Sequence, residues 1–204
     1  MLADGSGRLT ARESGEGVTL VSAESTARLI WDGNDMFRAL KRIAHQVLEA
    51  NRGPERLVLL GIQTRGVPLA ARLGALIAES EGVDVPVGEL DITMYRDDLR
   101  SQPTRAVGRT RIPVALDDRT VVLVDDVLYS GRTIAAAMDA LSDIGRPRAV
   151  RLAVLIDRGH RELPIQADHV GKDLPTRSEE HVRVALTEID GEDLISISQP
   201  SKGA

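Results

Sequence analysis

Residues 121–133 read VVLVDDVLYSGRT, and the small, apolar run IAAAMDAL follows at 134–141. The uninterrupted aliphatic residues at 121–124 predict a strand that is buried on both faces of a parallel sheet, and the Ala-rich run predicts a helix. In open α/β sheets, ligands bind beyond the carboxyl ends of the strands. Residues 125–133 are therefore expected to form a loop at a ligand site.

The residue types in this loop suit a phosphorylated sugar. The Ser-Gly-Arg-Thr sequence at 130–133 would surround an anion with backbone N–H groups, hydroxyls and a helix N-terminus, and Gly131 would let the backbone approach closely. Asp125 and Asp126 can accept hydrogen bonds from the two vicinal hydroxyls of a ribose. Taken alone, the same residues are also typical of a helix cap and a solvated loop. We interpret the loop as a site for a 5-phosphorylated ribose.

Length and composition restrict the class of protein. The chain has 204 residues, no cysteine and a net charge of −5. The length suits one α/β domain with an appendage, and the lack of cysteine excludes disulfides and thiolate metal sites. The negative charge disfavours general coating of nucleic acid but allows a local basic face. Because we find no membrane-spanning run and no signal peptide, we expect a cytoplasmic enzyme.

The chain is expected to consist of one domain between two tails. Residues 1–25 have low hydrophobicity and no period, which predicts a disordered leader, and residues 200–204 are expected to be a short tail. The domain at 26–199 should include a small hood, mainly at 157–198. Residues 96–118 lack a hydrophobic period, so we interpret them as a flexible basic lid that could close over a polyanionic leaving group. The arginines of this lid are Arg96, Arg100, Arg105, Arg109 and Arg111.

Other hydrophobic patterns predict the remaining elements. The sequence Asp32-Gly-Asn is a capping cluster from which a helix should run to about Asn51, and the central helix should end at Gly145 in a left-handed conformation. Strands are expected at 57–62, 88–95 and 149–156. Three further short strands are expected to form a small sheet over the carboxyl edge, at 165–171, 183–188 and 194–198.

A second strand–loop–helix unit follows the strand at 57–62. The loop reads Gln63-Thr-Arg-Gly, and Val67-Pro68 then opens a helix that should reach about Glu79. Arg65 and Gly66 would lie at the same edge of the sheet as the first loop. This loop could hold a second phosphate group, although a plain connection would have the same length.

The helix predicted at 32–51 has a basic face. Arg38, Lys41, Arg42 and His45 recur at helical spacing opposite the apolar positions. A solvated surface is the ordinary explanation of such a face. It gains functional meaning only if another basic segment lies beside it. The apolar positions of this helix, expected to form its core face, are Met36, Leu40, Ile43, Ala44, Val47 and Leu48.

Three strings together give the chain a family resemblance. They are LGIQTRG at 60–66, GELDITMYRDDL at 88–99, and the run from VVLVDDVLYSGRT at 121–133 to LAVLIDRGHRELP at 152–164. The chain resembles the PyrR family of bifunctional pyrimidine-operon regulators and uracil phosphoribosyltransferases over roughly residues 37–197. The resemblance implies an α/β fold of the type I phosphoribosyltransferase class, with a central, mostly parallel sheet flanked by helices and covered by a small hood.

The resemblance also implies a reaction and its site. Uracil and phosphoribosyl pyrophosphate (PRPP) would give UMP and pyrophosphate, with Mg²⁺ carried mainly by PRPP and no dedicated metal site in the protein. Arg158 would lie near the uracil, and Arg96, Arg105 and Arg109 would close over PRPP. The implied contacts to PRPP are Thr64, Arg65, Asp125, Asp126, Val127, Leu128, Tyr129, Ser130, Gly131, Arg132 and Thr133.

A second implied activity is binding of pyrimidine-operon mRNA, with UMP or UTP as co-regulator. The basic helix face would meet a second group of residues from the hood and together form a positive patch on an acidic protein. The second group is His160, Arg161, Lys172, Thr176 and Arg177. The resemblance further implies a homodimer or a larger homo-oligomer.

Three positions depart from the family pattern. Gln63 stands where many relatives have Lys, and Ala50 and Gln166 stand where some have an RNA-binding Arg. Two alternatives therefore remain open. The chain could be a nucleotide-sensing RNA-binding regulator with little catalysis, or a phosphoribosyltransferase for another base, such as adenine, hypoxanthine or orotate. The string DRGHRELP at 157–164 argues against another base.

Overall fold

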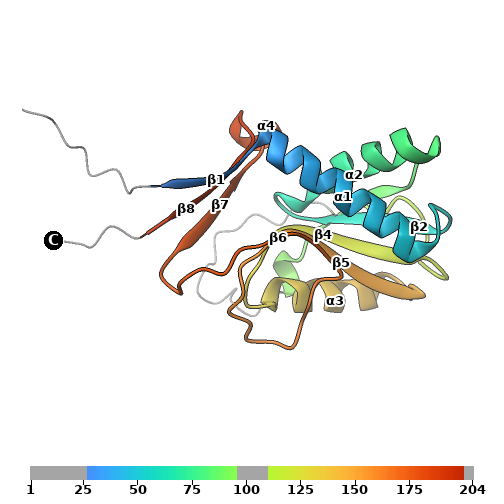
Figure 1. Cartoon of the computed structure of the whole chain (residues 1–204). Coiled ribbons are helices and arrows are strands. Elements are labelled where there is room, and N and C mark those ends of the chain that lie inside the picture. The colour runs from blue at the N-terminus through green and yellow to red at the C-terminus, as the bar shows by residue number, and fades with distance from the viewer. Residues whose placement is uncertain (1–26, 96–109, 200–204) are drawn as a thin grey trace, which may run out of the picture.

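A five-stranded parallel sheet forms the centre of the computed structural model, which describes residues 27–95 and 110–199. The strand order is β3-β2-β4-β5-β6. Helices α1 and α2 cover one face and α3 covers the other (Figure 1). The strands are β2 (Leu57–Ile62), β3 (Val87–Leu90), β4 (Thr120–Leu128), β5 (Ala149–Asp157) and β6 (His169–Asp173), and the helices are α1 (Gly33–Asn51), α2 (Gly66–Glu81) and α3 (Arg132–Ile144).

The apolar runs of the sequence become the middle of this sheet. Every residue of β2 is buried, as are the first six of β4, because helices cover both faces of these strands. The core is divided by the sheet into two clusters: α1 and α2 pack on one side and α3 on the other. The predicted α/β class, with a parallel sheet flanked by helices, is confirmed.

Helix α1 begins where the capping cluster predicts. The Asp32 side chain accepts a hydrogen bond from the Asp35 N–H at 2.9 Å, and the Asp35 carboxylate accepts one from the Asp32 N–H at 3.4 Å, which is a capping box. The six predicted core residues of this helix are all buried, and the basic residues on the other face are all exposed.

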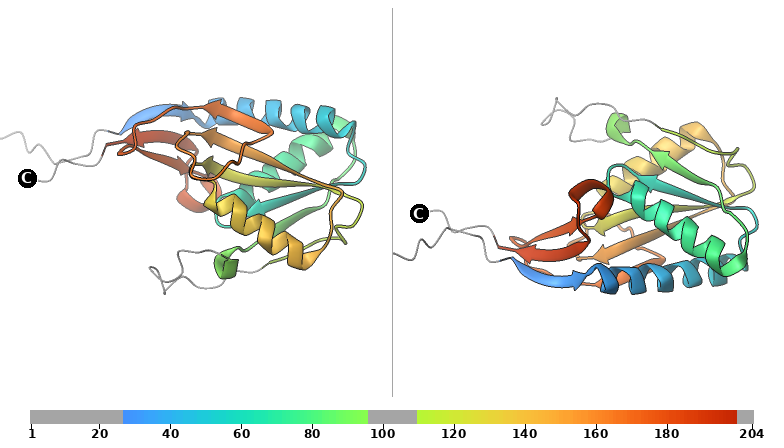
Figure 2. Two further views of the ribbon diagram at one scale, coloured as in Figure 1. Left: turned by 90° about the horizontal axis from the view of Figure 1, so that it is seen from below. Right: turned by 90° about the horizontal axis from the view of Figure 1, so that it is seen from above.

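A second, antiparallel sheet of three strands lies at one end of the first (Figure 2). Its order is β1-β8-β7, and the short helix α4 (Thr187–Asp190) lies between β7 and β8. The strands are β1 (Arg28–Asp32), β7 (His181–Ala185) and β8 (Leu194–Ser198). We call β1, β7, α4 and β8 the small sheet unit. Val184 and Ile195 of this unit join the same buried cluster as α1 and Leu155 of β5, so the two sheets share one core.

The structure corrects several predicted boundaries. The segment predicted as a strand at 165–171 instead forms β6 at 169–173, and this strand pairs with β5 in the main sheet. Its place in the small sheet is taken by β1, which pairs with β8. The strand predicted at 88–95 ends at Leu90, before a short 3₁₀ turn at Thr93–Tyr95. Gly145 does end α3, but with φ 176° it is extended rather than left-handed.

Among the described residues, no helix is both long enough and apolar enough to cross a membrane. The predicted leader at 1–25, the predicted tail at 200–204 and most of the predicted lid lie outside those residues. The part of the predicted lid that is described, 110–118, contains no helix or named strand. Arg111 within it exchanges two backbone hydrogen bonds with Glu89, at 2.8 and 2.9 Å, and so anchors that end of the segment to β3.

Candidate active site at the ends of two neighbouring strands

The chain changes direction across the sheet between β2 and β4. From β2 it passes through α2 to β3 on one side, whereas β4 lies on the other side of β2 and leads into α3 on the opposite face. Such a reversal of strand order leaves a crevice beyond the carboxyl ends of the two strands, which is where ligands bind in open α/β sheets. The loops after β2 and β4 are the two that the sequence predicts to bind phosphate.

The loop after β2 lies directly against β4. A Cβ atom on Gly66 would lie 2.2 Å from the Val124 carbonyl oxygen, and one on Gly61 would lie 2.4 Å from the Gly66 carbonyl oxygen. Both positions therefore require glycine for this close approach. The Gln63–Thr64 peptide bond is cis, the Thr64 side chain is exposed and Arg65 stands immediately before α2.

Asp125 and Asp126 belong to β4 itself, not to the loop after it as the sequence predicts. Asp125 is buried, and its carboxylate accepts a hydrogen bond from the Asp126 N–H at 2.9 Å. The Asp126 carboxylate accepts one from the Val127 N–H, also at 2.9 Å. Burial raises the pKa of Asp126, while the Asp125 side chain, the Val127 N–H and the nearby charge of Arg65 act in the opposite direction. Donors such as ribose hydroxyls would therefore be favourable partners for this carboxylate.

Residues 129–131 form a turn, here called the phosphate loop, between β4 and α3. Gly131 has φ +93°, a conformation that residues with a Cβ rarely adopt, and α3 begins at the next residue. The Ser130 hydroxyl accepts a weak hydrogen bond from the Arg132 N–H at 3.4 Å. The loop thus leads directly into the N-terminus of a helix of 13 residues, where the helix dipole favours an anion.

The segment 158–165 packs against this loop and lines it from behind. The Arg158 N–H donates to the Leu128 carbonyl at 3.1 Å, and the N–H groups of Glu162 and Leu163 both donate to the Ser130 carbonyl, at 3.0 and 3.1 Å. The Arg132 side chain pairs with the Glu162 carboxylate at 2.7 Å. The string DRGHRELP at 157–164 therefore holds the phosphate loop through hydrogen bonds.

Arg158, the predicted uracil contact, is buried beneath Tyr129. Its guanidinium carbon lies 4.4 Å from the centre of the Tyr129 ring. The side chain also donates to the Thr176 hydroxyl at 3.0 Å and to the Arg177 carbonyl at 3.1 Å. Beside this group, a cavity of about 600 Å³ is lined by Asp157, Gly159, Arg161, Leu163, Pro164, Ile165, Gln166, Asp173 and Pro175.

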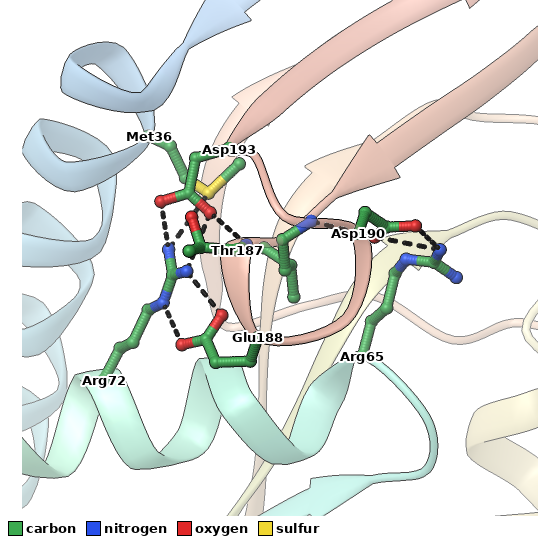
Figure 3. Close-up of polar contacts among 8 residues, drawn as sticks. Met36, Arg65, Arg72, Thr187, Glu188, Asp190 and Asp193 are labelled. Atoms are coloured by element: carbon green, nitrogen blue, oxygen red, sulfur yellow. Dashed lines mark hydrogen bonds and ion pairs between the residues drawn. The ribbon is translucent and has the colours of Figure 1, made fainter.

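Arg65 binds the small sheet unit rather than standing free in the crevice. It donates to both carboxylate oxygens of Asp190 in α4, at 3.0 and 3.2 Å, and its Nε atom is buried without a hydrogen-bond partner in the described structure (Figure 3). Further along the chain, Arg72 of α2 donates to Glu188 of α4 and to Asp193 just after it, with four contacts of 2.6 to 2.9 Å. Arg65, just before α2, and Arg72 within it therefore hold α4 and its flanking turn.

The predicted RNA-binding residues fall into two adjoining groups. On α1, Arg38, Lys41 and His45 are exposed, and Arg42 reaches across to donate to the Gly171 carbonyl of β6. The Lys172 Nζ atom, also in β6, lies 5.8 Å from the centre of the Trp31 ring in β1. The contact of Arg42 thus brings the basic face of α1 beside β6.

The second group follows β5 and β6. His160 Nε2 lies 2.7 Å from the Thr176 carbonyl, so the segments around these two residues adjoin, and the side chain of Arg177 is exposed. Arg161 differs from the others, because its guanidinium contacts the protein itself at several points. The predicted lid arginines Arg96, Arg105 and Arg109 lie outside the described residues.

Several residues that build this site carry no signal in the sequence. Glu162 lies within the string DRGHRELP but carries no signal of its pairing with Arg132. Arg72 looks like any exposed helical arginine, and its partners Glu188 and Asp193 are more than 100 positions away. Asp190 is equally remote from Arg65. No local pattern indicates such pairs, because they exist only once α4 packs on α2.

Comparison with known proteins identifies the family of the chain. Residues 30–188 match the model of the phosphoribosyl transferase domain family. The chain is 60% identical to the bifunctional protein PyrR of Streptomyces coelicolor over 84% of its own length and 90% of that protein. It is 55% identical to the protein of the same name from Deinococcus radiodurans, over 84% of this chain and 94% of that one. The chain belongs to the PyrR family. Members of the PyrR family thus share with it nearly their whole length, including both loops of the crevice.

Solved structures show the same fold at low sequence identity. A hypoxanthine phosphoribosyltransferase from Trypanosoma cruzi aligns with a TM-score of 0.67 at 17% identity, over 88% of this chain and 94% of that one. The enzyme of the same name from Staphylococcus aureus aligns with a TM-score of 0.63 at 18% identity, over 85% and 93%. The PyrR family chain therefore has the phosphoribosyltransferase fold that the resemblance implies.

Proposed function

We propose that this phosphoribosyltransferase acts on uracil, converting uracil and PRPP to UMP and pyrophosphate. The observation that carries the proposal is that three features lie at the carboxyl ends of the neighbouring parallel strands β2 and β4. They are a carboxylate pair, a glycine-dependent turn at a helix N-terminus and the loop that holds Arg65. These three features match the ribose hydroxyls, the 5-phosphate and the pyrophosphate of PRPP. Uracil as the base rests on the string at 157–164, by which the chain resembles the uracil-specific family.

The residues of the crevice would act by positioning and by charge. Asp125 and Asp126 would accept hydrogen bonds from the ribose hydroxyls, and the backbone of residues 128–133 would hold the 5-phosphate. Thr64 and Arg65 would bind the departing pyrophosphate, whose negative charge grows as the bond to the anomeric carbon breaks. Gln63 cannot supply the positive charge of the Lys found in many relatives, so Arg65 carries more of this task.

The carboxylates of the site fit a magnesium ion that arrives with PRPP. Within residues 27–95 and 110–199, no group of three or more acidic or histidine side chains could hold a metal alone. Mg²⁺ is typically bound by one or two carboxylates together with substrate phosphates and water, and Asp125 and Asp126 can supply that share. When bound, the ion would neutralise charge on the pyrophosphate oxygens.

The second proposed function is binding of pyrimidine-operon mRNA, controlled by UMP or UTP in the same crevice. Its support is the hydrogen bond from Arg42, on the basic face of α1, to the Gly171 carbonyl of β6, the residue before Lys172. Exposed Arg and Lys side chains would bind phosphates, and His160 and Arg177 would extend the surface along the loops after β5 and β6. We place this activity in the cytoplasm, in a homodimer or larger homo-oligomer.

An assay of UMP formation tests the enzymatic proposal. Purified protein is incubated with uracil, PRPP and Mg²⁺, beside the double variant Asp125→Asn, Asp126→Asn. We expect the wild type to form UMP and the variant, which keeps its shape but loses both negative charges, to form little. Adenine, hypoxanthine and orotate serve as competing bases, because a pocket that hydrogen-bonds its base discriminates strongly.

Two outcomes would favour the alternatives. A folded protein that binds PRPP or UMP but forms no product would be a nucleotide-sensing regulator, and the neutral Gln63 gives that alternative its weight. Faster reaction with another base would contradict the assignment of uracil while leaving the phosphoribosyltransferase activity intact.

A further inference from the structure

Arg161 is the most highly connected side chain of the string DRGHRELP. Its Nε atom donates to the Ile165 carbonyl at 2.9 Å, and Nη1 donates to the carbonyls of Tyr129 and Gly159 at 2.8 and 3.2 Å. Its Nη2 atom pairs with the Asp157 carboxylate. A guanidinium has five N–H donors, so these four contacts leave one for any external partner. The side chain is only 22% exposed.

The contact to the Tyr129 carbonyl determines how the next peptide group is turned. In a trans peptide the C=O and N–H groups point in opposite directions. The Tyr129 carbonyl faces Arg161, so the Ser130 N–H faces away from the 158–165 segment. The Ser130 carbonyl faces the Glu162 and Leu163 N–H groups in the same way, which turns the Gly131 N–H to that same far side. Two successive N–H groups therefore point together beside the start of α3, as in an anion-binding nest.

We propose that Arg161 is a positioning residue, which holds the phosphate loop in its anion-binding shape, and that it does not bind RNA itself. This inference rests on the proposed function, because it assigns the 5-phosphate of PRPP or UMP to that loop. Arg161 joins the end of β5, through Asp157, to the middle of the loop, through Tyr129. Without the hydrogen bond from Arg161, the peptide between Tyr129 and Ser130 could rotate and turn its N–H away from the phosphate.

The planar fork of arginine is needed for this role. One side chain reaches three carbonyls and one carboxylate in fixed directions, whereas glutamine is shorter and neutral and cannot span these acceptors. An RNA contact has different requirements, because phosphate neutralisation depends mainly on an accessible positive charge. The exposed Arg177 meets that requirement, and Arg161 does not.

The experiment measures PRPP affinity and RNA affinity in parallel. The variants are Arg161→Gln, Asp157→Asn and, as a control, Arg146→Gln, which changes an exposed arginine just after α3. The dissociation constant of PRPP with Mg²⁺ is measured by calorimetry, without uracil. RNA binding is measured with an in vitro transcript of the pyrimidine-operon leader at several salt concentrations. Thermal unfolding followed by circular dichroism identifies any variant that fails to fold.

We expect the PRPP dissociation constant to rise roughly tenfold in both Arg161→Gln and Asp157→Asn, about the loss of one hydrogen bond to a charged group, and to be unchanged in Arg146→Gln. The salt dependence of RNA binding without nucleotide should be the same in Arg161→Gln and the wild type. Asp157→Asn is the decisive variant, because it keeps every positive charge and weakens the anchor of Arg161, while the amide oxygen can still accept the Gly159 N–H.

Unchanged PRPP affinity in Arg161→Gln and Asp157→Asn would overturn the inference. So would a salt slope for RNA reduced by about one in Arg161→Gln, which is the effect of losing a direct phosphate contact. A wild-type protein that does not bind PRPP would instead contradict the proposed function. The two failures are therefore distinguishable in one set of measurements.

Discussion

Arg65, in the loop predicted to bind pyrophosphate, donates two hydrogen bonds to the Asp190 carboxylate of α4, at 3.0 and 3.2 Å. The N–H of Leu186 and the charge of Arg65 together lower the pKa of Asp190, so this carboxylate is ionised at neutral pH. Pyrophosphate would therefore have to compete with Asp190 for the same guanidinium. Binding of pyrophosphate would thus also affect the contact between Arg65 and the small sheet unit.

Replacing Asp190 should strengthen pyrophosphate binding. In Asp190→Asn the side chain can still accept the Leu186 N–H, but it no longer offers a negative charge to Arg65. We expect a roughly two- to fivefold lower dissociation constant for pyrophosphate with Mg²⁺, the size typical of an exposed ion pair. Glu188→Gln is the matched control, because it removes a carboxylate of the same helix that contacts Arg72 instead. Weaker binding in Asp190→Asn would contradict this competition.

A side chain on Gly131 should damage the phosphate loop. Its φ of +93° is unfavourable for any residue with a Cβ, and an added Cβ would meet Leu163 and Ile165 at 3.4 Å. Gly131→Ala should cost about 1–2 kcal/mol of stability and raise the KM for PRPP. Gly82→Ala is the control, since Gly82 has φ +69° at the end of α2 with no neighbour within 4 Å. It should lose comparable stability in thermal unfolding but keep the KM of the wild type.

The ion pairs of Arg72 should stabilise the folded protein at neutral pH and lose that effect in acid. The hydrogen bond from Arg72 lowers the pKa of Glu188. Burial of the Asp193 carboxylate opposes ionisation, but hydrogen bonds from Arg72 and the Thr187 N–H outweigh it, so the pKa of Asp193 is also lowered. Carboxylates with a lowered pKa in the folded state stabilise it fully above their unfolded values, here 4.5 and 3.8, and lose that effect as pH falls through the folded values.

Denaturant titrations of the double variant Glu188→Gln, Asp193→Asn would check this effect. At pH 7 the variant should be less stable than the wild type by about 1 kcal/mol, a value reduced for partial solvent screening. The difference should shrink as the pH is lowered below 4.5. Glu162→Gln, which removes an ion pair that is half exposed on both sides, should change stability little at any pH. A difference that grows in acid would refute the assignment.

Loss of charge on α1 should weaken RNA binding without affecting the crevice. Lys41→Ala, Arg42→Ala together should lower the affinity for the operon transcript by about 1–2 kcal/mol and make the salt dependence shallower by about one and a half to two. Filter binding at several salt concentrations measures both quantities. Arg146→Ala, just after α3 on the opposite face of the sheet, should change neither. Equal slopes in the double variant and the wild type would rule out the α1 face.

The elements that positioned the crevice could be predicted because their signals are local. Strand β2 was expected at 57–62 and is found at Leu57–Ile62, since an unbroken aliphatic run can satisfy its backbone only between covered neighbours. Helix α1 followed from its capping cluster and its apolar period. Asp125 and Asp126 were recognised but placed in a loop, because an acidic pair usually ends a buried strand. Here β4 continues through both, because it stays paired with β5 as far as Leu128.

What the amino-acid sequence determined by itself was the α/β class, the two strand–loop–helix units and the family, because each depends on residues that are close together in the chain. Only the tertiary structure decided that β1 pairs with β8, that β6 extends the main sheet and that α4 is held by Arg65 and Arg72. It also decided that Arg161 donates to the Tyr129 carbonyl of the phosphate loop. These contacts join distant segments, and their energies arise only when packing brings the partners together and removes water between them.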